Sequence, residues 1–220
     1  MYQLINAPPS PYGRKVAVAL HEKGVPFETI YDLPWADAVE TRKHSPLEQL
    51  PILLVPGEEP IYDSSYILQW LEGHHPEPAL LPRDRDERLT ALKLQTLGER
   101  LMEIAQAVIF ETYRPQLSEQ AIDRGTRKIV RGLEEAERLV TDANVPRHGE
   151  PINLGHIALG TTLLVWEFVV GEKMSPAIDA LVWRDRFPAL TTLIAALETR
   201  PSFSATAPTS MHVDIGAEVG

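Results

Sequence analysis

The chain has 220 residues, of which 44% are hydrophobic and 24% charged, and it contains no cysteine. This composition is typical of an ordinary globular protein, and the length suffices for one large domain or two small ones. Without cysteine the chain has no disulfide, no thiolate metal ligand and no protein thiol nucleophile. The formal net charge is −10, with no basic half or tail, which argues against nucleic acid as a partner.

The chain lacks the patterns that direct a protein to a membrane or out of the cell. The residues after Met1 show no basic region followed by an apolar core, so we expect no secretory signal. The longest uncharged apolar run, 157–166, is too short to span a bilayer and is cut by Glu167. We therefore interpret it as a buried helix and expect a cytoplasmic protein that has no membrane partner.

Residues 1–76 alternate strand and helix patterns, which predicts an α/β domain. A short strand comes first, and Ser10 followed by Pro11 has the pattern of a capped helix start. Gly24 closes that helix, and the strand after it completes a parallel strand–helix–strand unit. The expected elements are strands 2–6 and 27–31, a helix from Ser10 to Gly24, a hairpin of 50–55 with 61–62, and a helix that begins at Ser64.

Residues 77–83 read as a short linker, and 84–220 as an all-helical domain. Apolar residues recur at helical spacing through this second segment, which favours a bundle. The expected helices run from Asp84 to before Pro115, over 122–140, after Asn153, after Ser175 and over 188–199.

Four motifs, in one order along the chain, resemble the soluble glutathione transferases, and most of all the serine-type tau and zeta classes and small bacterial members. They are Ser-Pro-Tyr-Gly-Arg-Lys-Val at 10–16, Ser-Pro-Leu-Glu-Gln-Leu-Pro at 45–51, Asp63-Ser64, and the stretch from Phe187-Pro188 to Arg200-Pro201. The resemblance covers roughly residues 2–208. It implies a thioredoxin-like α/β N-terminal domain joined to an all-α helical-bundle domain, with the active cleft between them.

Ser10 is the candidate catalytic residue. Glutathione reacts as its thiolate, because only the thiolate is a good nucleophile. A hydroxyl that donates to the sulfur at a helix N-terminus favours this anion. Lowering a thiol pKa by about two units takes roughly 2.7 kcal/mol, which one charge-assisted hydrogen bond and a helix dipole supply. From the residues alone, Ser10 is equally read as a simple helix cap, and that role competes for the same hydroxyl.

The resemblance also assigns glutathione-binding residues. It implies a cis bond at Leu50-Pro51, which leaves the backbone of Leu50 free to pair with that of glutathione, next to Gln49. Asp63 and Ser64 suit the ammonium and carboxylate of the γ-glutamyl group. The alternatives are an ordinary loop proline and a plain capped helix start.

One departure concerns the glycyl carboxylate of glutathione. Many relatives bind it with Lys or His at a position that holds Ala36 or Asp37 here. Arg42, Lys43 and His44 are the candidates that substitute for it.

Other distinctive residues are interpreted as structural. His74-His75 suggests a metal site, but adjacent residues rarely share a ligand face, and we expect no metal. Trp166 and Phe168 lie in an apolar helix and are read as core residues. His156 is a poor partner for Asn153 in a capping box, which predicts a weak helix start.

The function that the resemblance implies is glutathione S-transferase activity towards a small hydrophobic electrophile, carried out by a homodimer. Trp35, Phe110 and Tyr113 are the candidate residues for binding the electrophile. Ser10 stabilises the thiolate rather than forming a covalent intermediate. Two alternatives remain open: a glutathione-dependent isomerase or etherase, and a non-catalytic binding or assembly module of the same fold.

Overall fold

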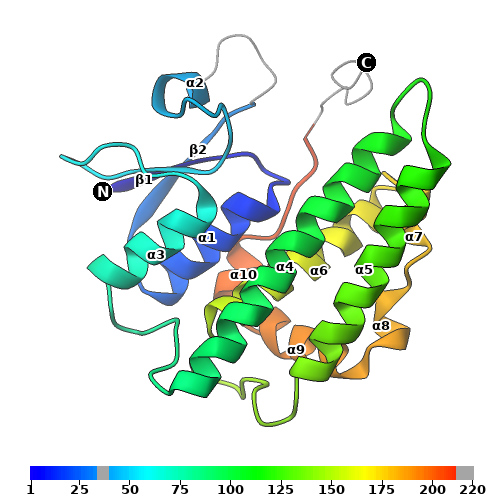
Figure 1. Cartoon of the computed structure of the whole chain (residues 1–220). Coiled ribbons are helices and arrows are strands. Elements are labelled where there is room, and N and C mark those ends of the chain that lie inside the picture. Colours follow the sequence, from blue (N-terminus) through cyan, green and yellow to red (C-terminus); the bar gives the residue numbers. More distant parts are fainter. Residues whose placement is uncertain (34–39, 212–220) are drawn as a thin grey trace.

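The computed structural model describes residues 1–33 and 40–211 and divides them into an N-terminal part and a helical part (Figure 1). The N-terminal part holds β1 (Tyr2–Asn6), α1 (Pro11–Glu22), β2 (Phe27–Tyr31), α2 (Thr41–His44), β3 (Ile52–Leu54) and α3 (Ser64–His74). The helical part holds α4 (Arg85–Thr112), α5 (Glu119–Leu139), α6 (Leu154–Gly171), α7 (Pro176–Asp179), α8 (Trp183–Arg186), α9 (Pro188–Glu198) and α10 (Pro201–Ala205). The predicted order, α/β and then all-α, is confirmed.

The N-terminal part is built on a small mixed sheet with strand order β2-β1-β3. In its central strand, Leu4 pairs with Thr29 of the parallel strand β2 and with Leu53 of the antiparallel strand β3. Helices α1 and α3 pack together beside this sheet (Figure 1). After α1 the chain turns at Gly24, where φ is +64°, a backbone conformation that favours glycine.

The predicted antiparallel hairpin is present in a shorter form. Strand β3 begins at Ile52, and its return arm is a single bridge between Leu53 and Ile61. Pro60 brings no N–H to the ladder, and Asp63 already caps the next helix. The chain therefore leaves the sheet after one pair of residues.

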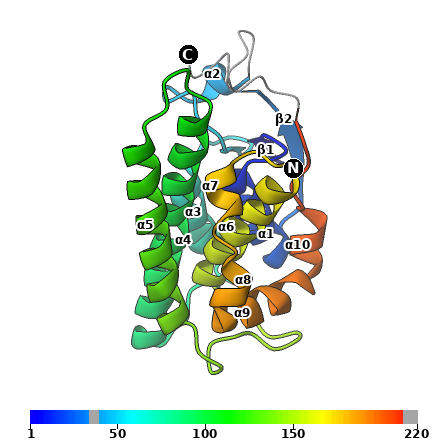
Figure 2. The same cartoon turned by 90° about the vertical axis from the view of Figure 1, so that its right-hand side faces the viewer.

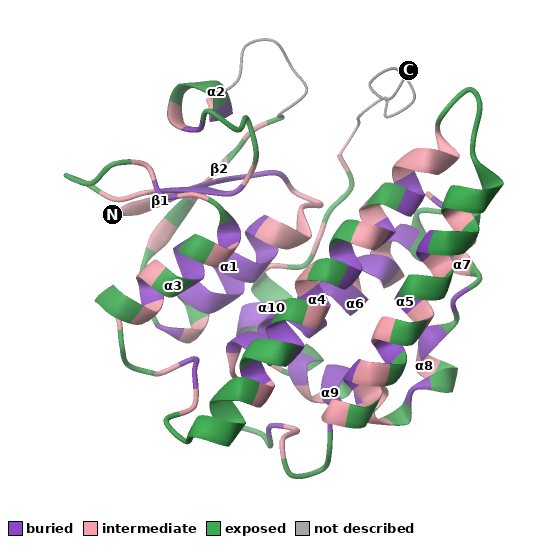
Figure 3. Ribbon diagram, in the orientation of Figure 1, coloured by how far each residue is buried: buried purple, intermediate pink, exposed green. Residues whose placement is uncertain are grey.

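Helix α6 is the central element of the helical part and lies between α4 and the last helices (Figure 2). A Cβ added at Gly98 of α4 would lie 2.7 Å from the carbonyl carbon of Ala158, so the two helix backbones approach closely. By length and composition α6 qualifies as a candidate membrane span, but 72% of it is buried inside the fold. Figure 3 shows it in the buried colour along most of its length, as expected for a core helix.

The start of α6 is better capped than the sequence suggests. The Oδ1 atom of Asn153 accepts from the backbone N–H of His156, and the Nδ1 atom of His156 accepts in return from the backbone N–H of Asn153, at 3.3 Å. Burial lowers the pKa of His156 to about 4, so the imidazole is neutral and its Nδ1 remains an acceptor. The expectation of a poor reciprocal partner was therefore wrong.

Two short helices were not anticipated, α8 and α10. The second of these, α10, packs against α1 and helps to join the two parts. At this junction the buried Arg14 donates from Nη2 to the carbonyl oxygen of Phe203, at 3.2 Å. From α10 the chain runs upward between the two parts (Figure 1), and the N–H of Thr209 donates to the carbonyl oxygen of Pro8.

Candidate active site

A cleft of about 790 Å³ lies between the two parts of the molecule. We call its two sides the N-terminal wall and the helical wall. The N-terminal wall includes Ser10, Gln49, Leu50, Asp63 and Ser64. The helical wall consists of residues of α4 and α6 that line the same cleft, and its apolar members include Met102, Ile109, Phe110, Val165, Phe168 and Val169. The predicted glutathione-binding residues thus meet the helical part across one space.

Ser10 lies on this cleft as the N-cap of α1. Its Oγ accepts a hydrogen bond from the N–H of Gly13 at 3.3 Å. A hydroxyl has one proton to donate and two lone pairs that accept. The cap occupies one lone pair and leaves the proton, so capping and donation to a ligand do not compete. This corrects the expectation that one role displaces the other.

The segment before β3 supplies backbone to the same wall. The Leu50-Pro51 bond is cis, as the sequence analysis predicts. Gln49 and Leu50 line the cleft, whereas Pro51 is buried and is not among the lining residues.

Asp63 and Ser64 form the start of α3. The Oδ1 atom of Asp63 accepts from the N–H groups of Ser65 and Tyr66, at 3.0 and 3.2 Å. Its side chain is exposed on the cleft and retains Oδ2 as a second acceptor. Ser64 beside it is buried. A carboxylate and the N-terminus of a helix therefore lie together, which suits a ligand that carries both an ammonium and a carboxylate.

The helical wall brings together two of the three residues proposed for the electrophile. Phe110 and Tyr113 line the cleft, and the hydroxyl of Tyr113 donates to the carbonyl oxygen of Met174 at 2.9 Å. Trp35 lies outside the described residues. The two aromatic residues of α6 differ. Trp166 is buried in the core as expected, whereas Phe168 packs partly buried against the core and also lines the cleft.

Sequence reasoning missed a pair of polar residues in the cleft, Tyr12 and Gln106. The hydroxyl of Tyr12 donates to Oε1 of Gln106 at 3.2 Å, across the boundary between the two parts. A signal for each was present: Tyr12 follows Ser10 at the same helix start, and Gln106 lies one helical turn before Phe110. Burial, with a further contribution from Glu103, raises the pKa of Tyr12 to about 12, so its hydroxyl stays protonated at neutral pH.

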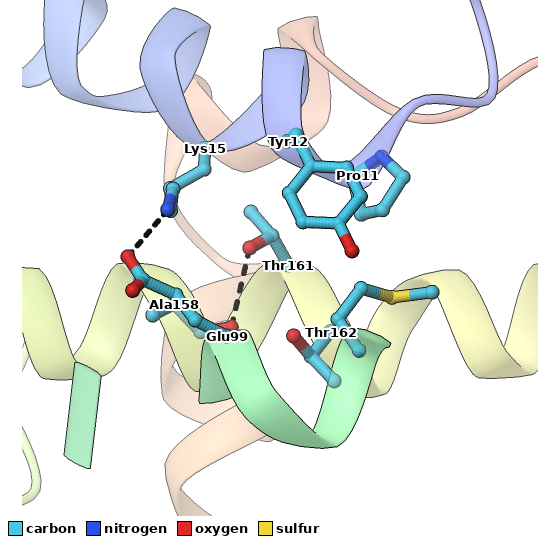
Figure 4. Close-up of a pocket in the computed structure, with 8 residues that line it drawn as sticks. Pro11, Tyr12, Lys15, Glu99, Ala158, Thr161 and Thr162 are labelled. Atoms are coloured by element: carbon cyan, nitrogen blue, oxygen red, sulfur yellow. Dashed lines mark hydrogen bonds and ion pairs between the residues drawn. The ribbon is translucent and has the colours of Figure 1, made fainter. Parts of the chain in front are cut away.

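A buried ion pair fixes the two parts to each other close to the cleft (Figure 4). The Nζ atom of Lys15 lies 2.5 Å from Oε1 of Glu99, and Gln95 and Ser65 also donate to this oxygen. Burial alone would raise the pKa of Glu99, but the ammonium of Lys15 and these hydrogen bonds bring it below its ordinary value. Because Ser65 is in α3, the starts of α1 and α3 are both tied to α4.

The comparisons with known proteins agree with this geometry. A family model described as the glutathione S-transferase N-terminal domain matches residues 4–79. The uncharacterized GST-like protein YibF of Escherichia coli is 30% identical over 94% of this chain and 98% of its own length. The chain belongs to the glutathione S-transferase family.

Solved structures of glutathione transferases superpose along nearly the whole chain. The enzyme from Methylobacterium radiotolerans, in complex with glutathione sulfonate, has a TM-score of 0.85 and 40% identity, covering 96% of this chain and 97% of that one. The enzyme from Methylobacillus flagellatus, with glutathione bound, has a TM-score of 0.83 and 26% identity over 95% and 100% of the two chains. The predicted thioredoxin-like domain followed by a helical bundle is therefore confirmed.

Several acidic side chains line the cleft. The lining residues include the carboxylates of Glu48, Asp63 and Glu103. Arg42 is ion-paired with Glu48 at 2.9 Å, and none of Arg42, Lys43 and His44 lines the cleft in the part of the chain that the structure describes. Ala36 and Asp37 lie outside the described residues. Within residues 1–33 and 40–211, no group of His, Cys, Asp or Glu side chains is arranged to hold a metal ion.

Proposed function

We propose that this protein is a glutathione S-transferase that binds glutathione along the N-terminal wall, holds its thiolate at Ser10, and directs it at a small hydrophobic electrophile on the helical wall. The observation that carries the proposal is the convergence of two helix starts and the backbone at Leu50 on one cleft that faces an apolar wall. Ligand pockets typically combine such an apolar surface with a few polar groups.

The γ-glutamyl and cysteinyl groups of glutathione would each find a partner on the N-terminal wall. The γ-glutamyl carboxylate would take the N-terminus of α3 at Ser64, and the ammonium would take the free oxygen of Asp63. The cysteinyl backbone would pair with Leu50 in the manner of an added strand. This arrangement places the thiol towards the N-terminus of α1.

The chemistry would be stabilisation of an anionic nucleophile. The hydroxyl of Ser10 would donate a hydrogen bond to the sulfur, while a lone pair of the same oxygen continues to accept from the N–H of Gly13. The dipole of the twelve-residue helix α1 adds to the stabilisation of the negative sulfur. The thiolate then attacks a carbon atom of the electrophile. As the sulfur–carbon bond forms, a bond of that carbon breaks, and its electron pair departs with a leaving group or stays on the electrophile and is protonated by water; no covalent bond to the protein forms.

The experiment is to compare turnover of a chromogenic electrophile by the native protein and by Ser10→Ala. We expect kcat/KM to fall by about one to three orders of magnitude, because a donor to the developing charge is lost. The matched control is Ser118→Ala. Ser118 caps α5 with the same geometry, its Oγ accepting from the N–H of Ala121 at 3.2 Å, and it is not among the residues that line the cleft.

The outcomes separate the two classes of function. If Ser118→Ala keeps full turnover and Ser10→Ala loses it, the hydroxyl at the cleft acts in the reaction. Retention of the native protein on glutathione resin, without turnover of a broad panel of electrophiles, would instead favour a non-catalytic binding module. The homodimer and the cytoplasmic location remain predictions, which sedimentation of the purified protein and fractionation of expressing cells would test.

A further inference from the structure

The helical wall of the cleft is apolar except at a few side chains, and most of these are already occupied. The hydroxyl of Tyr113 donates to the carbonyl oxygen of Met174. The carboxylate of Glu103 accepts from Nη1 of Arg100 at 2.6 Å and has no proton to donate when ionised. Among the described residues of α4 and α6 that line the cleft, this leaves the amide of Gln106 as the hydrogen-bond donor.

The amide of Gln106 is held by one end only. Its Oε1 accepts from the hydroxyl of Tyr12 at 3.2 Å, a bond that joins α1 to α4. Its Nε2 has two N–H groups, and no group within residues 1–33 and 40–211 accepts from them. Gln106 is only partly exposed, and a partly buried amide beside an apolar surface gains from an acceptor that the molecule filling the cleft supplies.

We propose that Gln106 is a catalytic residue that donates from Nε2 to an oxygen of the electrophile on which negative charge develops during the reaction. This inference rests on the proposed function, since it needs glutathione on the opposite wall. The γ-glutamyl and cysteinyl groups of glutathione have their proposed partners on the N-terminal wall, whereas Gln106 lies on the helical wall, one helical turn from Phe110. We therefore assign the acceptor for Gln106 to the second substrate.

For an α,β-unsaturated ketone, the reaction step balances with the bound thiolate and a proton from water. The thiolate forms a bond to the β-carbon, and the electrons of the carbon–carbon double bond move to give an enolate. Negative charge develops on the carbonyl oxygen, where a fixed N–H donor is most effective. A proton from water then adds to the α-carbon, replacing the one that the thiol lost to solvent. Tyr12 is a positioning residue here, because it holds the amide oxygen away from the substrate.

The test uses two glutathione conjugates that differ by one oxygen: the adduct of methyl vinyl ketone, and S-butylglutathione. Calorimetry on the native protein should show that the ketone conjugate binds about five- to tenfold more tightly, which is the effect of one hydrogen bond. Gln106→Leu should abolish this preference while its affinity for S-butylglutathione stays within about twofold. Tyr12→Phe should reduce the preference without abolishing it. Gln120→Leu, the same exchange at an exposed position of α5, should leave it unchanged.

Turnover gives a second readout. Gln106→Leu should lower kcat/KM for methyl vinyl ketone by about 10- to 100-fold and leave the pKa of the bound glutathione thiol unchanged. If the native protein binds glutathione and both conjugates equally well, the proposed function stands and the role of Gln106 is overturned. If it binds none of the three, the proposed function itself is wrong. A preference that survives in Gln106→Leu would also overturn the inference.

Discussion

The two walls of the cleft are made of different kinds of groups. The N-terminal wall is made largely of helix starts and backbone: Ser10 caps α1, Asp63 caps α3, and Leu50 enters through its cis bond to Pro51. The helical wall is made of side chains that project from the C-terminal halves of α4 and α6, such as Met102, Phe110 and Phe168.

This difference determines how each wall responds to substitutions of its side chains. A helix start keeps its free amides and its dipole whatever side chains surround it, so it suits a constant ligand. A wall of apolar side chains changes shape with each substitution. We therefore expect changes in the N-terminal wall to alter glutathione binding, and changes in the helical wall to alter the choice of electrophile.

The largest expected effect concerns the ion pair between Lys15 and Glu99, which joins the two parts of the molecule. Lys15→Met leaves the carboxylate of Glu99 buried without its cation, and we expect a loss of about 3–5 kcal/mol in the free energy of unfolding. The double variant Lys15→Met with Glu99→Leu should recover most of this loss, because no unpaired charge remains. Denaturant titration measures both. If the double variant were as unstable as Lys15→Met, the loss would not come from an unpaired charge at Glu99, and the prediction would be wrong.

The second prediction concerns the helical part alone. His156 is buried and its folded pKa is lowered to about 4 from 6.5, so the unfolded chain binds its proton first as the pH falls. The stability associated with the neutral imidazole is present above pH 6.5 and declines between pH 6.5 and 4, by about 3 kcal/mol in total. His156→Gln keeps an acceptor for the cap, and its unfolding free energy should fall less over this range. Equal acid sensitivity in both proteins would contradict the assignment to His156.

The third prediction tests the N-terminal wall. Asp63→Asn keeps the cap of α3, since Asn is an equally good N-cap, but removes the negative charge that we propose binds the ammonium of glutathione. The Kd for glutathione should rise about tenfold while stability changes little. Asp84→Asn is the matched control, because Asp84 caps α4 through the N–H groups of Asp86 and Glu87 away from the cleft lining. If both substitutions affect the Kd alike, Asp63 has no specific role.

The smallest expected effect belongs to the helical wall. Phe168→Leu should weaken binding of S-hexylglutathione about threefold, since some apolar contact is lost, and leave the Kd for glutathione unchanged. Val170→Ala, at an exposed position of the same helix, should change neither. If Phe168→Leu lost affinity for both ligands equally, the two walls would not bind separate parts of the ligand as we expect.

The N-terminal wall was predictable because its signals are local. Ser10 before Pro11, and Asp63 before Ser64, each mark a helix start within two residues of sequence. The bond between Tyr12 and Gln106 joins residues 94 positions apart, so it depends on how α1 packs on α4. The face of α6 that reaches the cleft was also hidden, because that helix is apolar all round and Phe168 follows Trp166 by only two positions. The hairpin was predicted too long, because composition does not show where a strand stops pairing.

The most direct test of the account is the titration of the glutathione thiol on the protein, followed by the ultraviolet absorbance of the thiolate. The native protein should lower the pKa of the bound thiol by about two units relative to free glutathione. In Ser10→Ala most of that pKa shift should be lost, although the variant should still bind the tripeptide. A bound thiol that titrates like the free one, or a shift that persists in Ser10→Ala, would contradict the assignment of the sulfur to the start of α1.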